Sequence, residues 1–250
     1  MKIVAIVQAR MGSTRLPNKV MKPIGGTPMI ELLLNRLAGA KEVDQIILAT
    51  STDERNLPLV DHVRKLGYTC EQGSEKDVLE RYLQTAEKHA ADVVVRITGD
   101  CPLVDPDLVD KVIRRFKAAN VDYLSNTNPP TYPDGLDIEI FTFKALEQAN
   151  QETSDPFDRE HVTPYLRKPG KFQTAALQHS QDLSALRWTV DEPADFAVIE
   201  NVFQYFPPRT DFSWCEVLTL QSQQPELFSL NQHLVRNEGA KMGTGQKLWK

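Results

Sequence analysis

The 250-residue chain has only three cysteines, and they lie far apart in the sequence. Cys70, Cys101 and Cys215 form no C-x-x-C pair, so a disulfide framework and a zinc knuckle are both disfavoured. A long hydrophobic run is also missing. The apolar stretch near the N-terminus is too short for a signal peptide or a membrane-spanning helix. We therefore expect a cytoplasmic protein without a membrane partner.

The chain also has no excess of positive charge. Its 34 acidic residues outnumber 29 basic ones, and the formal net charge is −5. Proteins that coat nucleic acid are usually basic, so we expect no nucleic-acid partner. Hydrophobic residues make up 41% of the chain, which is an ordinary globular proportion. A chain of this length can therefore bury a sizeable core.

Apolar residues alternate between strand-like runs and helical spacing over the first half of the chain. We expect strands at residues 3–7, 45–50, 68–71, 92–98 and 121–125, and helices at 28–38, 57–66, 78–86 and 106–116. Thr27 is the expected cap of the first helix and Asp105 that of the last. This alternation predicts an α/β fold, a three-layer, mainly parallel, doubly wound sheet.

The pattern changes after residue 125. A proline-rich loop is expected at 126–134, and further strands at 136–143, 172–178 and 187–190, the first of them antiparallel. Asp191 is expected to cap a helix that ends near Tyr205, and Ser213 with Glu216 has capping-box spacing. We expect one domain over residues 1–236, with a small antiparallel insertion at about 126–180. A loosely held tail is expected at 237–250.

Small residues and cations gather in the loop after the first predicted strand. The nucleotide-binding residues predicted there are Ala9, Arg10, Gly12, Ser13, Arg15 and Lys19. Small residues let backbone N–H groups approach phosphate oxygens, and the three cations neutralise phosphate charge. The loop is neither a Walker A loop nor a G-x-G-x-x-G turn, which disfavours kinase-type and dehydrogenase functions. A solvated basic loop is the alternative to this triphosphate site.

The same loop resembles the A-R-x-G-S-x-R-L-P-x-K signature of the sugar cytidylyltransferases, and residues 25–30, GGTPMI, are also similar. The resemblance extends to about residue 206, in particular to the spore coat polysaccharide branch. It implies a nucleotide-diphosphosugar transferase fold, CTP as the nucleotide, and an acidic sugar-type acceptor in surface polysaccharide synthesis. It also implies a homodimer, since dimers are common in the family.

Two aspartates follow apolar runs that we predict to be strands. Asp100 follows the strand that ends at Thr98, and Asp191 follows the run at 187–190. Nucleotidyl transfer needs a divalent cation, and Mg²⁺ prefers carboxylate oxygens, so both are predicted metal ligands. They also match the family's metal-binding aspartates. Capping of a helix is the alternative role for Asp191. The predicted catalytic residues are Arg10, Lys19, Asp100 and Asp191.

Thr98 and Cys101 stand where the ketodeoxyoctulosonate enzymes of the family carry Gln and Glu. These departures leave the choice of base and acceptor open. Cys101 is not expected to be a nucleophile, because no histidine is paired with it locally and the chemistry needs no covalent intermediate.

Other polar residues are weaker candidates. Those predicted near the nucleoside are Thr50, Ser51, Ser74, Thr98 and Asp100, and those predicted to bind the acceptor are Asn126, Asp134, Asp137, Glu139, Arg159 and His161. Caps, turns and solvated strand or helix faces are the alternatives for these groups. Two other functions also stay open, a glycosyltransferase of related fold and a non-catalytic nucleotide-binding subunit.

Overall fold

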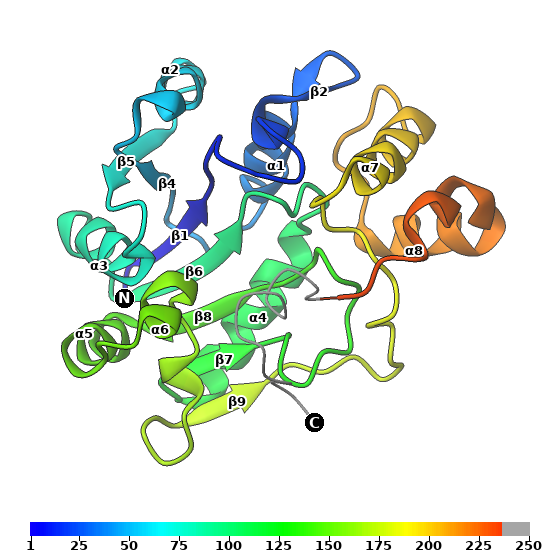
Figure 1. The fold of residues 1–250 in the computed structure, drawn as a ribbon. Coiled ribbons are helices and arrows are strands. Elements are labelled where there is room, and N and C mark those ends of the chain that lie inside the picture. The colour runs from blue at the N-terminus through cyan, green and yellow to red at the C-terminus, as the bar shows by residue number, and fades with distance from the viewer. Residues whose placement is uncertain (237–250) are drawn as a thin grey trace.

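Helices cover both faces of one seven-stranded sheet, as the alternating pattern predicts (Figure 1). A computed structural model describes residues 1–236, so the predicted tail at 237–250 lies outside the described residues. The strands of the sheet are β1 (Ile3–Gln8), β4 (Gln45–Ser51), β5 (Thr69–Gly73), β6 (Val93–Thr98), β7 (Tyr123–Ser125), β8 (Glu139–Thr142) and β9 (Thr174–Ala176). Their order is β5-β4-β1-β6-β8-β7-β9.

The sheet is mainly parallel, and β8 runs antiparallel to both of its neighbours, β6 and β7. The α-helices are α1 (Met29–Leu37), α2 (Leu57–Lys65), α3 (Val78–Lys88), α4 (Pro106–Ala119), α5 (Phe143–Glu152), α6 (Pro156–His161), α7 (Pro193–Tyr205) and α8 (Trp214–Gln223). Residues 126–180 therefore supply two strands of the main sheet as well as α5 and α6.

Alternate side chains of β1 point to opposite faces of the sheet and build two cores. Ile3, Ala5 and Val7 join the core under α1, α2, α4, α7 and α8. Val4 and Ile6 join the core under α3 and α5. Because both faces are covered, β1 is a continuous apolar run, and polar groups can be exposed only where the strands end.

Three local predictions were wrong. Thr27 does not cap α1, because it pairs with Ile24 in a short antiparallel hairpin, β2 (Pro23–Ile24) and β3 (Thr27–Pro28). The helix therefore begins at Met29, without a side-chain cap. The predicted strand at 187–190 is absent, and Arg187 makes only an isolated bridge to Asp134. The expected strand at 136–143 is limited to β8, since Phe143 already begins α5.

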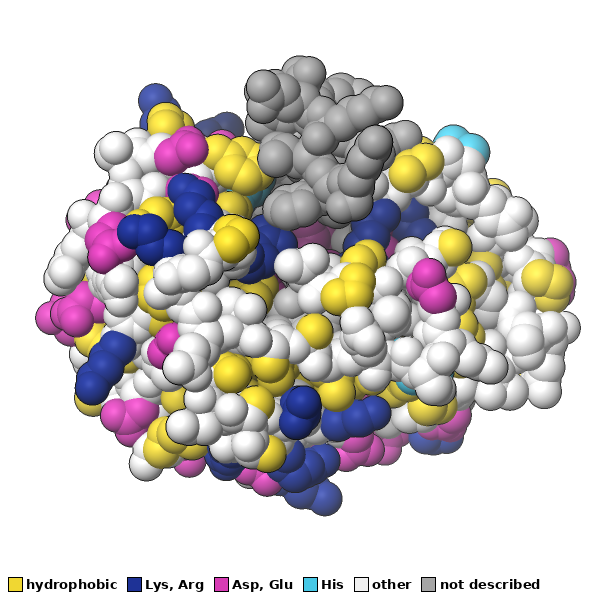
Figure 2. All heavy atoms as spheres, turned by 90° about the horizontal axis from the view of Figure 1, so that it is seen from below, with side chains coloured by type: hydrophobic (Ala, Val, Ile, Leu, Met, Phe, Trp, Pro, Cys, Tyr) yellow, Lys and Arg dark blue, Asp and Glu magenta, His cyan; other side chains and the backbone are white. Residues whose placement is uncertain are grey.

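Few large apolar side chains are exposed at the surface of the described chain. Those that are exposed are Met1, Leu57, Tyr205, Leu230 and Val235. Figure 2 shows apolar side chains scattered among acidic and basic ones over one face of the molecule. Within residues 1–236, no helix is long and apolar enough to cross a membrane.

Candidate active site

A pocket of about 480 Å³ opens where β1 and β6 end. The predicted site residues that line it are Ala9, Arg10, Gly12, Ser13, Arg15, Lys19, Thr98, Asp100, Asp134, Asp137, His161 and Asp191. This is the edge at which ligands bind in open α/β sheets. The structure therefore brings the basic loop, both predicted metal ligands and part of the predicted acceptor group into one cavity.

Lys19 joins the loop to the two aspartates. Its Nζ donates to Asp191 Oδ1 at 2.9 Å and to the Val190 carbonyl at 2.6 Å, and it lies 3.5 Å from Asp100 Oδ2. Burial alone would lower the pKa of Lys19, but the two carboxylates raise it above its usual value. Burial would raise the pKa of Asp100, yet Lys19 holds it below its usual value. Lys19 and Asp100 therefore stay charged at neutral pH.

Asp191 does not cap α7, so the alternative role considered for it is wrong. Glu192 occupies the N-cap position. Asp195 accepts hydrogen bonds from the backbone N–H groups of Asp191 and Glu192, at 2.9 and 3.0 Å. The Asp191 carboxylate is thus left to face Lys19, and it also lies 3.2 Å from Arg15. Asp195 thus binds the backbone N–H groups at the start of α7, and the Asp191 carboxylate stays available in the pocket.

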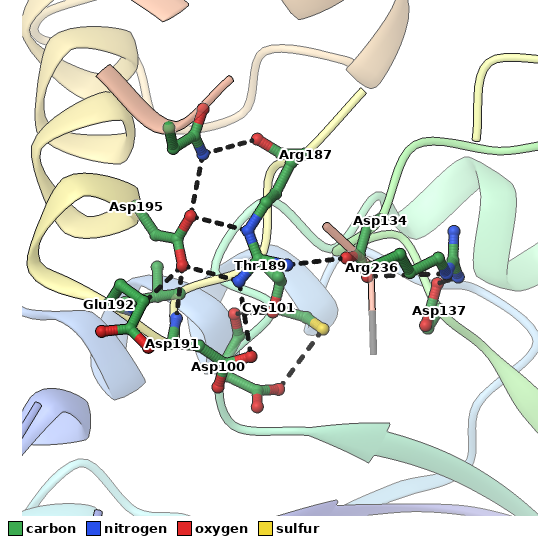
Figure 3. A network of polar contacts seen from close by, with 12 residues as sticks. Asp100, Cys101, Asp134, Asp137, Arg187, Thr189, Asp191, Glu192, Asp195 and Arg236 are labelled. Carbon is green, nitrogen blue, oxygen red and sulfur yellow. Dashed lines mark hydrogen bonds and ion pairs between the residues drawn. The ribbon is translucent and has the colours of Figure 1, made fainter. Parts of the chain in front are cut away.

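Arg187 organises the wall of the pocket beside Asp191, as Figure 3 shows. Its Nε and Nη2 each donate to Asp195 at 2.8 Å, and its Nη1 donates to Asp134 at 3.2 Å. Asn231 also donates to Asp195, at 2.9 Å. Sequence patterns did not identify Arg187 as a site residue, because one of its partners lies 53 positions away.

A second arginine, Arg236, reaches the same wall from the end of the described chain. Its Nη2 donates to Asp137 at 2.6 Å, and its Nε lies 3.8 Å from Asp134 (Figure 3). Burial and the neighbouring Asp137 raise the pKa of Asp134 to about 7. Burial also raises the pKa of Asp137. Carboxylates thus outnumber their cations on this wall, and their oxygens are suited to accept hydrogen bonds from hydroxyl groups.

Three residues predicted near the nucleoside do not line the pocket. Thr50 and Ser51 are fully buried within β4, and Ser51 accepts a hydrogen bond from the Asn56 side chain at 2.7 Å. The Ser74 hydroxyl accepts from the backbone N–H of Asp77 at 3.0 Å, next to the start of α3. Ser74 therefore shapes the start of this helix, which was its alternative role.

Three residues predicted to bind the acceptor, Asn126, Glu139 and Arg159, also lie outside this pocket. Asn126 is buried and shapes its loop, donating to the Leu136 carbonyl at 2.7 Å and accepting from Ile138 N at 2.8 Å. Glu139 is buried in an ion pair with Arg96 and accepts from the Tyr123 hydroxyl at 2.6 Å. These partners satisfy both side chains inside the fold.

Arg159 lines a neighbouring pocket of about 700 Å³, which shares Arg10, Glu75 and Glu160 with the first. Its Nε donates to Asp77 at 2.6 Å. His161 does line the first pocket, with its ring centroid 4.4 Å from that of Phe157. Burial lowers the pKa of His161.

Cys101 lies at the pocket but is buried, and its Sγ is 3.3 Å from the Thr98 hydroxyl. Burial and the adjacent Asp100 raise the pKa of its thiol well above the usual value. For the nucleotidyl transfer predicted from the sequence, we therefore expect Cys101→Ser to keep a rate within about threefold of wild type, whereas loss of a true nucleophile costs more than about 10⁴-fold. A loss of that size would show that the thiol takes part in catalysis.

The chain is similar in sequence and fold to known proteins. The cytidylyltransferase family model matches residues 4–204. The chain is 34% identical to spore coat polysaccharide biosynthesis protein SpsF of Bacillus subtilis, over 90% of this chain and 95% of that protein. It is 29% identical to 3-deoxy-manno-octulosonate cytidylyltransferase 2 of Hydrogenovibrio crunogenus, over 73% of this chain and 68% of that protein.

Among solved structures, a cytidylyltransferase of Leptospira borgpetersenii superimposes with a TM-score of 0.88 and 31% identity, over 94% of this chain and 98% of that one. The agreement thus covers the fold as well as the sequence. The chain belongs to the cytidylyltransferase family and is an enzyme of that class.

Proposed function

We propose that this enzyme transfers CMP from CTP to a hydroxyl of an acidic sugar-type acceptor and releases pyrophosphate, in the synthesis of a surface polysaccharide precursor. The position of Lys19 supports this proposal most directly, since it ties the basic loop to Asp100 and Asp191 within one pocket. A phosphate grip beside two charged carboxylates is the arrangement that transfer at the α-phosphate needs. The relatives named for polysaccharide or octulosonate chemistry support the acceptor class.

In this proposal, the acceptor oxygen forms a bond to the α-phosphorus while the bond from that phosphorus to the bridging oxygen breaks. Arg10, Arg15 and Lys19 hold the phosphates and the departing pyrophosphate. Asp134 and Asp137 accept hydrogen bonds from acceptor hydroxyls on the opposite wall. The proton of the attacking hydroxyl leaves to solvent.

Asp100 and Asp191 are the residues that would hold Mg²⁺. Within residues 1–236, no group of three or more His, Cys, Asp or Glu side chains is arranged to bind a metal. Two partly exposed carboxylates that share one ammonium group still fit a cation that takes its remaining ligands from phosphate and water. When bound, Mg²⁺ would neutralise charge that develops at the α-phosphate.

Pyrophosphate release tests the proposed function. We would supply each ribonucleoside triphosphate with Mg²⁺, with and without 3-deoxy-manno-octulosonate and related sugar acids, and expect release with CTP only when an acceptor is present. Sugar transfer from a nucleotide sugar without such release would instead identify a glycosyltransferase. Binding of CTP without turnover for any acceptor would favour a non-catalytic nucleotide-binding subunit.

Replacing Arg15 tests the phosphate grip. Its guanidinium is partly exposed and lies 3.2 Å from both Asp191 and Glu192, at the mouth of the pocket. We expect Arg15→Ala to weaken CTP binding by roughly tenfold to hundredfold, the loss typical of a charged hydrogen bond. Isothermal titration with CTP measures this, and Arg114→Ala, at an exposed position on α4, is the control. An unchanged affinity would contradict the phosphate role of the loop.

A homodimer is also part of the proposal, and it rests on the resemblance of the sequence to a family in which dimers are common. Light scattering on the eluting peak of a size-exclusion column would measure the mass of the particle. A mass equal to that of one chain at micromolar concentration would reject the dimer.

A further inference from the structure

Arg81 is a buried cation without a carboxylate partner. It lies on α3, is 2% exposed and lines the active-site pocket. No carboxylate oxygen of the described residues is within 4.0 Å of its guanidinium, whereas Arg96 and Arg187, which also line the pocket, are paired with Glu139 and Asp195. An unpaired charge inside a protein is costly, so a buried cation of this kind calls for a ligand.

One edge of the Arg81 guanidinium makes no hydrogen bond to any other residue of 1–236. Nη1 donates to the Ser74 carbonyl at 2.6 Å. Nε is buried, and neither Nε nor Nη2 has an acceptor among the described residues. Nε and Nη2 carry two parallel N–H groups, the fork with which arginine grips a pair of neighbouring acceptor atoms. The unpaired Nε and Nη2 edge therefore fits a ligand with two adjacent hydrogen-bond acceptors, and it does not fit a donor.

The stem of Arg81 is held in place by its surroundings. A Cβ added at Gly73 would lie 2.9 Å from Arg81 Cγ, so the glycine at the end of β5 makes room for this side chain. Burial, with Arg10 close by, lowers the pKa of Arg81. A confined side chain loses little freedom when it binds, and it presents its fork in a fixed direction.

The position of Arg81 in the fold indicates which part of the substrate it meets. β5 and β4 lie on one side of β1, with α3 beside them, whereas β8 and β7 lie on the other side of β6 (Figure 1). Asp134 and Asp137 line the pocket on the β8 side, where the acceptor is proposed to bind. A nucleotide gripped at the loop after β1 then has its base on the α3 side. Thr50 and Ser51, first predicted to be near the base, are buried away from it.

We infer that Arg81 selects the cytosine base, with its Nε and Nη2 edge donating to N3 and O2. Cytosine presents these two acceptors side by side, whereas uracil carries a hydrogen on N3 and would set donor against donor. The arrangement therefore favours CTP over UTP through one residue. This inference rests on the proposed function, since it takes CTP as the substrate.

Titration calorimetry with Mg²⁺ and four ligands tests the inference on the full chain. The ligands are CTP, UTP, inorganic tripolyphosphate and 3-deaza-CTP, in which C–H replaces the N3 acceptor. We expect the wild-type enzyme to bind CTP roughly tenfold to hundredfold more tightly than 3-deaza-CTP or UTP. Arg81→Lys keeps the charge but loses the fork, so it should bind CTP and 3-deaza-CTP about equally.

Tripolyphosphate carries no base, so it distinguishes base recognition by Arg81 from a general role of Arg81 in binding phosphate. Arg81→Lys should bind it with wild-type affinity, which also shows that the variant is folded, and Arg114→Lys, the same exchange at an exposed position on α4, should match wild type for every ligand. Equal wild-type affinity for CTP and 3-deaza-CTP would overturn the inference without any variant. An equal loss of tripolyphosphate binding in Arg81→Lys would overturn it too. A wild-type enzyme that does not bind CTP would instead reject the proposed function.

Discussion

Asp100→Asn should reduce nucleotidyl transfer by at least roughly a hundredfold, because it removes one of the two charged carboxylates that would hold the cation near the α-phosphate. The substitution keeps the shape of the side chain and one oxygen. It also weakens the contact with Lys19, at 3.5 Å, while the contact of Lys19 with Asp191, at 2.9 Å, remains. Pyrophosphate release with CTP and the best acceptor found in the screen measures the rate.

A second readout separates metal binding from catalysis. Binding of Mn²⁺ in the presence of CTP, followed by its paramagnetic signal, should weaken in Asp100→Asn. Asp107→Asn is the matched control, since Asp107 is exposed at the start of α4 and outside the pocket. An Asp100→Asn enzyme with full turnover and unchanged Mn²⁺ binding would remove Asp100 from the proposed metal site.

The strands and caps that were predicted correctly have local signals. The buried runs of β1, β4 and β6 and the caps at Asp105 and Ser213 depend on neighbours within a few residues. The errors come from strand pairing, which the local composition does not reveal. Thr27 has the chemistry of a cap, but its pairing with Ile24 takes it into a hairpin. The run at 187–190 has the composition of a strand but no ladder of partners beyond one bridge.

The candidate site also has residues that local signals predict and residues that they do not. The basic loop and Asp100 follow strand ends, and parallel strands bring their ends together, so their meeting was predictable. Arg187 and Arg236 were missed because Asp134 and Asp137, the pocket carboxylates that they bind, are 53 and 99 positions away. Thr50 and Ser51 were misplaced because β4 runs to Ser51, one residue beyond the predicted end, and both side chains are fully buried. Sequence periodicity cannot fix the last residue of a strand to this accuracy.

Arg187→Met should lower the free energy of unfolding by roughly 3–5 kcal/mol, the loss typical of a broken buried ion pair. Asp195 is fully buried and receives two hydrogen bonds of 2.8 Å from Arg187, so the substitution leaves its charge without its main partner. Urea unfolding followed by circular dichroism measures the change. Arg209→Met is the control, because the pairs that Arg209 makes with Asp211 and Glu216 are exposed and screened by solvent, so its stability should stay close to that of wild type.

A double variant shows whether the uncompensated charge is the cause. Asp195→Asn removes the charge but keeps an oxygen that can accept from the backbone N–H groups of Asp191 and Glu192. We therefore expect Arg187→Met with Asp195→Asn to be more stable than Arg187→Met alone, by about 1–2 kcal/mol. If the second substitution instead lowers stability further, the loss must come from packing of the arginine stem.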